Sequence, residues 1–101
     1  MKTTFTVYEV SYNWCDDIDC WFIDATDAEF HANDEVAYEA DHRKRLGGRC
    51  EAGDLAADVF AVTYTIEDGD ESDDLLALAG KATAAGVPED SSKLVKTVTN
   101  D

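Results

Sequence analysis

Residues 58–66 read Asp-Val-Phe-Ala-Val-Thr-Tyr-Thr-Ile, the clearest strand pattern in the chain. Successive side chains of a strand point to opposite faces, so the alternation predicts one apolar face and one polar face. We expect the polar face, with Thr63 and Thr65, to point outward and the other to meet the core. The residues expected to point inward are Phe60, Val62, Tyr64 and Ile66.

Three further segments have strand character. Residues 4–12 are rich in β-branched and aromatic types, and residues 20–25 follow them after an acidic turn, which predicts a hairpin. The tail, residues 93–99, fits a short edge strand by its β-branched content or a helical turn by its apolar spacing, and we favour the strand. In the first strand, Tyr8, Val10 and Tyr12 are expected on one face, with Phe5 and Val7 on the other.

A first helix is predicted after residue 25. Thr26 and Glu29 have capping-box spacing, in which each side chain satisfies a backbone N–H of the first turn. The helix is expected to end where the basic residues 43–45 meet Gly47 and Gly48, because cations suit the negative helix end and glycine suits its stop. Its expected apolar face is a ladder of Ala28, Ala32, Val36 and Ala40, with Phe30 and Ala37 beside it.

A second helix is predicted from Leu75 towards Gly86, with Ser72 as its N-cap. Residues 51–57 form either a loop or one helical turn. With 101 residues and no internal repeat, the chain fits a single domain, residues 1–101. The fold class predicted is α+β, a small, mainly antiparallel sheet of three or four strands with two helices packed on one face.

The charge balance restricts the function. There are 23 acidic and 8 basic residues, giving a net charge of −15, so direct binding to nucleic acid or an anionic membrane is not expected. No export signal or membrane-spanning stretch is evident, which predicts a cytoplasmic protein, and we expect a monomer. Free thiols are expected at Cys15, Cys20 and Cys50, with a Cys15–Cys20 bridge as the alternative.

Neither a catalytic motif nor a cofactor motif is present, so we expect a protein that is not an enzyme and holds no cofactor. The acids of residues 67–74 do not follow EF-hand spacing, because Gly69 precedes most of them. His31 and His42 are eleven residues apart on a helix, about 16 Å, too far to share zinc. No metal is therefore expected, and His31 is expected to pair with Glu35 one turn away.

Two explanations for the acidity are open. A rigid face lined with carboxylates can occupy a basic groove that evolved for phosphates, since duplex DNA presents a charge about every 3.4 Å per strand. Alternatively, abundant Asp and Glu with few Lys adapt a protein to high salt, which screens the repulsion. In that case the acidity is an adaptation to the salt of the solvent, and the function of the domain is unknown.

A compact acidic chain with an Asp16–Asp19 loop, a Glu67–Asp74 cluster and no catalytic motif resembles the phage-encoded anti-CRISPR proteins that act as DNA mimics. The resemblance covers size, charge and organisation. It implies an inhibitor in the host cytoplasm that binds the basic DNA-binding surface of a CRISPR effector subunit and blocks target recognition. The residues that it would assign to partner binding are Asp16, Asp17, Asp19, Asp34, Glu35, Glu39, Asp41, Glu67, Asp68, Asp70, Glu71, Asp73 and Asp74.

Overall fold

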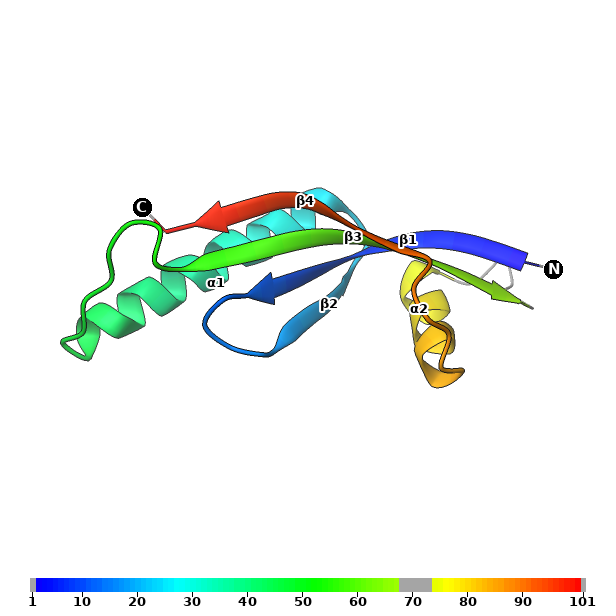
Figure 1. The fold of residues 1–101 in the computed structure, drawn as a ribbon, viewed down its shortest axis with the longest axis horizontal. Coiled ribbons are helices and arrows are strands. Elements are labelled where there is room, and N and C mark those ends of the chain that lie inside the picture. Colours follow the sequence, from blue (N-terminus) through cyan, green and yellow to red (C-terminus); the bar gives the residue numbers. More distant parts are fainter. Residues whose placement is uncertain (1, 68–73, 101) are drawn as a thin grey trace.

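The computed structural model describes residues 2–67 and 74–100, and these form four strands and two helices (Figure 1). All strand pairs are antiparallel, in the order β2-β1-β3-β4. The predicted α+β class is therefore confirmed, and so is the strand predicted for the tail. In chain order the elements are β1 (Lys2–Tyr12), β2 (Ile18–Phe22), α1 (Ala25–Arg45), β3 (Ala56–Glu67), α2 (Leu75–Ala84) and β4 (Ser91–Thr99).

The long central pair β1–β3 gives the molecule its shape. Its register runs without interruption from Lys2 opposite Glu67 to Tyr12 opposite Ala57. Because each strand of this pair spans more than 30 Å at about 3.4 Å per residue, the sheet is longer than it is wide, and we call it the ribbon. The whole molecule measures 55 × 21 × 20 Å.

Each helix covers its own half of this ribbon. Around α1, the buried cluster includes Val10 and Val59, with Tyr8 and Tyr12 packed against it. Around α2, the buried cluster includes Val7, whose side chain points to the opposite face of β1 from that of Val10. The two faces predicted for the first strand are therefore confirmed. One face packs in the α1 cluster and the other in the α2 cluster. The α2 cluster also contains Phe5, Ile66, Leu78, Ala79 and Ala82.

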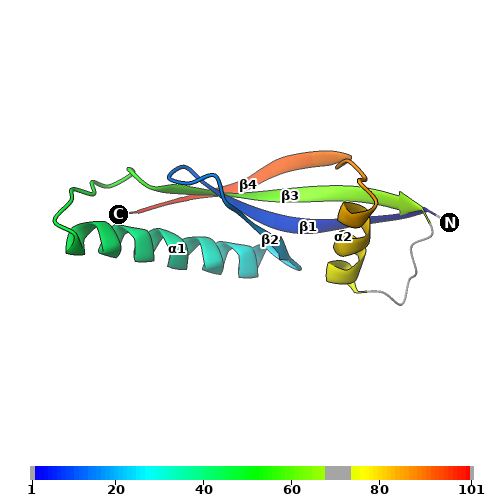
Figure 2. The same ribbon diagram turned by 90° about the horizontal axis from the view of Figure 1, so that it is seen from below.

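Twist brings the two helices to the same side of the ribbon. Alternate side chains of a strand point to opposite faces, yet Figure 2 shows α1 and α2 both below the strands. Both edge strands carry a register shift at the middle of the sheet, between Tyr8 and Glu9 opposite β2 and between Val59 and Phe60 opposite β4. Bulges increase the local twist, so these shifts help to turn alternate faces towards the same side.

The strand β3 does not bury its side chains entirely as predicted. Phe60 shares a face with Val62, Tyr64 and Ile66, but it is only half-buried and belongs to neither core cluster. The α2 cluster takes Ile66, with Tyr64 packed against it, so α2 covers the Glu67 end of this face. On the face that was predicted to point outward, Val59 is fully buried in the α1 cluster.

The first helix starts earlier than the capping box predicted. Asp24 is the N-cap, with extended backbone, and its carboxylate accepts the N–H of Asp27 at 2.8 Å. Thr26 is therefore already inside the helix, and the second strand ends before residue 24. The Ala28, Ala32 and Val36 ladder is buried as predicted, because these residues recur on one side of the helix.

The predicted neighbours of that ladder point the other way. Phe30 has 66% of its surface exposed, and Ala37 is exposed as well. At about 100° per residue, position 30 lies well away from positions 28, 32 and 36. The C-terminal end agrees with the prediction, because Arg43 and Lys44 lie in the last turn and Gly47 follows with φ of +81°.

The second helix is capped by Asp74, whose carboxylate accepts the N–H of Ala77 at 2.7 Å. The predicted cap, Ser72, lies outside the described residues. Residues 51–54 form a turn, and β3 begins at Ala56. Among the described residues, neither helix has the length and apolar character required to cross a membrane.

Candidate functional site

The turn with Asp16 and Asp17 lies far along the ribbon from Glu67, the first residue of the second predicted acidic cluster. The turn with Asp16 and Asp17 follows Tyr12, whereas the second cluster begins at Glu67, opposite Lys2. Ten residue steps along β1 separate Tyr12 from Lys2, about 34 Å of extended chain. Glu67 and the Asp16–Asp17 turn therefore do not belong to one compact site.

Asp19 anchors the first cluster to α1. Its Oδ2 accepts a hydrogen bond from the Tyr12 hydroxyl, and His31 Nε2 lies 2.6 Å from the same oxygen. The His31 side chain is 33% exposed and that of Asp19 is 43% exposed, and the Phe22 ring packs on the imidazole at 5.1 Å. The predicted partner of His31, Glu35, is thus replaced by Asp19, because the hairpin folds back onto the helix.

These contacts shift the pKa values of Asp19 and Tyr12. The hydrogen bond from Tyr12, and then that from His31, lowers the pKa of the Asp19 carboxyl against the opposing effect of burial. Burial, and then the hydrogen bond to Asp19, raises the pKa of the Tyr12 hydroxyl. Asp19 is therefore a charged structural link between β2, β1 and α1, and less available to a partner than Asp16 and Asp17, which are exposed.

The side of α1 that faces solvent alternates acids with aromatic rings. Residues spaced by three and four along a helix share one side, and five exposed residues follow this spacing over about 21 Å. Phe30 is 66% exposed and Tyr38 is 68% exposed. The Tyr38 ring also stacks on His42, with centroids 6.1 Å apart and planes at 5°. We call this surface the α1 outward face, and it consists of Asp27, Phe30, Asp34, Tyr38 and Asp41.

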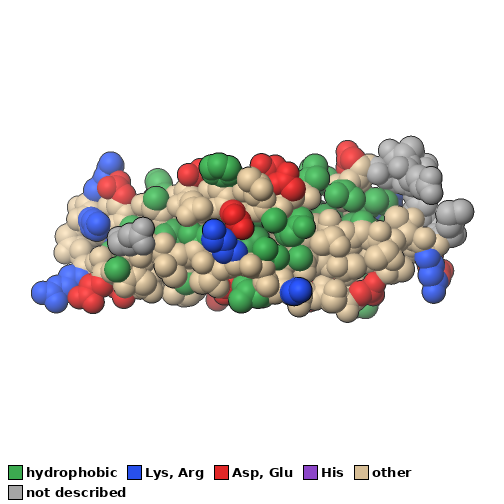
Figure 3. Space-filling view, turned by 90° about the horizontal axis from the view of Figure 1, so that it is seen from above, with side chains coloured by type: hydrophobic (Ala, Val, Ile, Leu, Met, Phe, Trp, Pro, Cys, Tyr) green, Lys and Arg blue, Asp and Glu red, His purple; other side chains and the backbone are tan. Residues whose placement is uncertain are grey.

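Two predicted site residues of α1 are engaged by cations of the same helix. Arg43 Nε lies 3.0 Å from Glu39, and Arg45 Nε lies 2.9 Å from Asp41. Figure 3 shows Lys and Arg side chains beside acids at this end of the molecule. The basic run therefore partly neutralises the end of α1, which leaves Asp34 and Asp27 as its exposed acids away from that run, with Glu35 half-buried.

The second cluster is described only at its two ends. Glu67 ends β3 and is exposed, and Asp74 is occupied as the N-cap of α2. The four acids between them, Asp68, Asp70, Glu71 and Asp73, lie outside the described residues. Of this predicted cluster, the described part thus contains a single exposed carboxylate that is not a helix cap.

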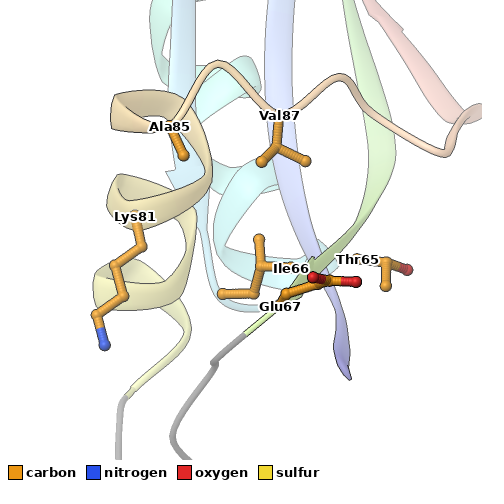
Figure 4. A pocket seen from close by; sticks show the side chains of 6 residues that line it. All are labelled: Thr65, Ile66, Glu67, Lys81, Ala85 and Val87. Atoms are coloured by element: carbon orange, nitrogen blue, oxygen red, sulfur yellow. The ribbon is translucent and has the colours of Figure 1, made fainter. Parts of the chain in front are cut away.

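A cavity of about 450 Å³ lies beside Glu67, between β3 and α2. Ile66 and Val87 point into it, and Lys81 extends away along α2 (Figure 4). Its walls are mainly apolar, and Glu67 and Lys81 provide its charged groups.

Sequence reasoning missed three members of the α1 outward face: Asp27, Phe30 and Tyr38. A helical projection of residues 25–45 places all three opposite the buried ladder, so the signal was available. The prediction instead placed Phe30 on the apolar face of the helix, because its side chain is hydrophobic. Asp27 was assigned only to the helix start, where it does lie.

No three His, Cys, Asp or Glu side chains converge as metal ligands within residues 2–67 and 74–100. Cys15 and Cys50 are free thiols, and Cys15 is exposed. His42 stacks on Tyr38, and His31 contacts Asp19, so each imidazole has a structural contact.

Comparisons with family models, with curated proteins and with solved structures find no match for this chain.

Proposed function

We propose that this protein is a non-enzymatic acidic inhibitor that binds the basic nucleic-acid-binding surface of another protein. The observation that carries the proposal is the α1 outward face, where two exposed aromatic rings alternate with carboxylates. Phe30 and Tyr38 each leave about two thirds of their surface in water. Aromatic residues are enriched in protein interfaces and often dominate their binding energy.

The ring and acid pattern suits a partner rich in arginine and lysine. Carboxylates such as Asp34 pair with those cations, and a guanidinium can also stack on an aromatic face. The exposed Asp16 and Asp17, in the turn that precedes Asp19, add negative charge to the surface outside the helix. Salt adaptation alone supplies a reason for the acids but none for the two exposed rings.

The overall charge density supports the same reading. A net charge of −15 spread over 55 Å gives one charge per 3.7 Å of the long axis. A single nucleic acid strand presents one charge per about 3.4 Å, and a duplex one per about 1.7 Å. A groove built for phosphates therefore meets a comparable density of negative charge. Following the resemblance in size and charge, we propose a CRISPR effector subunit as the partner.

Competition with nucleic acid tests this function. Guide-loaded CRISPR effectors are mixed with labelled target DNA, and fluorescence anisotropy is followed as the protein is added. We expect stoichiometric loss of DNA binding, reversal by excess DNA, and affinity that falls at least about tenfold between ~0.05 M and ~0.2 M salt. Inhibition that excess DNA and salt leave unchanged would contradict mimicry.

Stability at low ionic strength distinguishes salt adaptation. A domain adapted to high salt is expected to unfold when the screening of its −15 charge is removed, whereas an inhibitor that acts at ~0.15 M salt stays folded there. Thermal unfolding followed by circular dichroism at ~0.05 M and ~1 M salt measures the difference. Unfolding at the lower concentration would favour the salt-adapted domain.

A further inference from the structure

The α1 outward face is a narrow, straight stripe. At about 100° per residue, its five residues lie within about 80° of the helix circumference, opposite the buried ladder of Ala28, Ala32 and Val36. Figure 2 shows α1 as a straight helix with no described element on the side away from the strands. A partner that lies along this side therefore meets all five residues together.

The acids form a row along the middle of the stripe, and the rings flank it. Asp27, Asp34 and Asp41 recur every seven residues, so they are about 10.5 Å apart and nearly in line along the helix. Phe30 lies on one side of this row and Tyr38 on the other, about one turn before and one turn after Asp34. A cation that pairs with Asp34 therefore lies between two exposed rings.

The spacing of the acids fits a partner helix better than a partner strand. Side chains on one face of a strand recur about every 6.8 Å, whereas helical side chains seven positions apart recur at about 10.5 Å. A helix with a cation every seven residues thus matches the acids in turn. Two helices packed at a small crossing angle keep such a match along their length.

The charge of the stripe selects the kind of helix. A neutral helix would remove water from the carboxylates and give them no partner, which costs free energy. A second copy of α1 would bring three more acids against these three. Among the described ion pairs, only Asp41 of the three has a cation, Arg45 at 2.9 Å. Asp27 and Asp34 are therefore the acids that a basic helix would neutralise.

We propose that the α1 outward face binds an arginine-rich α-helix, which lies along α1 and places one guanidinium on Asp34 between Phe30 and Tyr38. The inference rests on the proposed function, because it names the element of the nucleic-acid-binding surface that the face meets. Helices that enter the major groove of DNA present Arg and Lys to it. Arginine suits this position better than lysine, because its planar guanidinium both pairs with a carboxylate and stacks on a ring.

Binding of helical peptides to the full chain tests the inference. The probe is three repeats of Leu-Ala-Gln-Arg-Ala-Ala-Gln, which places its arginines in line at the spacing of the acids. One control has the same composition with its arginines five residues apart, which spreads them around the helix. The other has one Ala of each repeat replaced by Pro, which breaks the helix. By fluorescence anisotropy at ~0.05 M salt, we expect the probe to bind at least about tenfold more tightly than either control.

Variants of both the chain and the probe locate the guanidinium. Replacing every Arg of the probe by Lys should weaken binding at least about threefold, because lysine lacks the planar group that stacks on the rings. Phe30→Ser with Tyr38→Ser should remove this preference for arginine. Leu76→Ser with Leu94→Ser, at exposed positions outside the face, should keep it. Circular dichroism checks that each variant is folded.

The possible results distinguish this inference from the proposed function. A chain that displaces DNA from an effector but binds the probe no more tightly than the controls would overturn the inference and leave the proposed function standing. A chain that binds the probe as expected but inhibits no effector would support the helix and contradict the function. A preference for arginine that survives loss of both rings would overturn the inference. Self-association that Phe30→Ser with Tyr38→Ser abolishes would overturn it as well, because a second copy would then occupy the face.

Discussion

The α1 half and the α2 half of the ribbon share the same central strands but are completed differently. Over the first half lies a helix of 21 residues, tied to the hairpin by Asp19 and His31, with a second polar anchor at Asn100. Over the second lies a helix of ten residues beside a cavity of about 450 Å³. The half with the longer helix presents the candidate binding surface.

Core truncation should show the largest difference between the halves. Leu55→Ala removes a fully buried side chain from the α1 cluster and is expected to cost about 4 kcal/mol of unfolding free energy. Leu78→Ala, in the α2 cluster, is expected to cost about 2 kcal/mol, because the short helix can move to fill part of the space. Urea unfolding measures both. Equal costs would show that the two halves are equally rigid.

The polar anchor near the chain end gives the next effect. Asn100 is 7% exposed; its Oδ1 accepts the N–H of Leu55 at 2.9 Å, and its Nδ2 donates to the carbonyl of Glu51 at 2.9 Å. Asn100→Ala leaves the buried N–H of Leu55 without that acceptor and should cost about 2 kcal/mol in urea unfolding.

Asn33→Ala is the control for this anchor. Asn33 is exposed and bonds only to a carbonyl of its own helix, that of Glu29, among the bonds described for it. Its replacement should leave stability unchanged or slightly raised, because alanine is the better helix former. A cost at Asn33 similar to that at Asn100 would contradict the role given to the anchor.

The Asp19 link should contribute less to the free energy of unfolding, and its contribution should depend on pH. Asp19→Asn is expected to cost about 1 kcal/mol near neutral pH, since the carboxylate is partly exposed. The pKa of Asp19 is lowered in the fold, so its charge stabilises the protein above the ordinary carboxyl pKa. This contribution is lost as the pH falls through the lowered value.

Unfolding measured at several pH values checks the link. The difference between the natural chain and Asp19→Asn should shrink in acid, whereas Asp17→Asn, at an exposed position of the same turn, should differ little at any pH. A difference that is constant with pH would show that the charge of Asp19 is not what matters.

The smallest effect on stability is expected on the α1 outward face. Phe30→Ser with Tyr38→Ser should change the unfolding free energy by no more than about 0.5 kcal/mol per site, because both rings are exposed. Thermal unfolding measures it. A larger loss would mean that the rings support the fold, and it would remove the reason to assign them to a partner.

Local patterns were enough to predict most of the fold. The Ala28–Ala32–Val36 ladder is determined by near neighbours and is buried as expected. The alternation of residues 58–66 predicted the strand, but not the burial of Val59 on its second face. The N-cap at Asp24 could not be separated from a capping box at Thr26, because both have suitable side chains within two residues. Phe60 was beyond sequence reasoning, since its exposure depends on where a helix far along the chain packs.

Less of the candidate site than of the fold could be predicted from the sequence. Acid type alone could not show that Asp19, Glu39 and Asp41 already have partners, because those contacts depend on how the hairpin and helix meet. Nor could it show that Glu67 lies far along the ribbon from the Asp16–Asp17 turn. The sequence predicted a negative surface, and the three-dimensional arrangement selects the α1 outward face within it.

Two charge-matched variants test the central claim most directly, in the effector competition assay at ~0.15 M salt. Asp27→Asn with Asp34→Asn removes two charges from the α1 outward face, and Glu67→Gln with Glu89→Gln removes two from exposed positions outside it. We predict that the first pair weakens inhibition of DNA binding at least about tenfold and that the second changes it less than about twofold. Equal loss in both pairs would contradict the account, because it would show that net charge, and not this face, meets the partner.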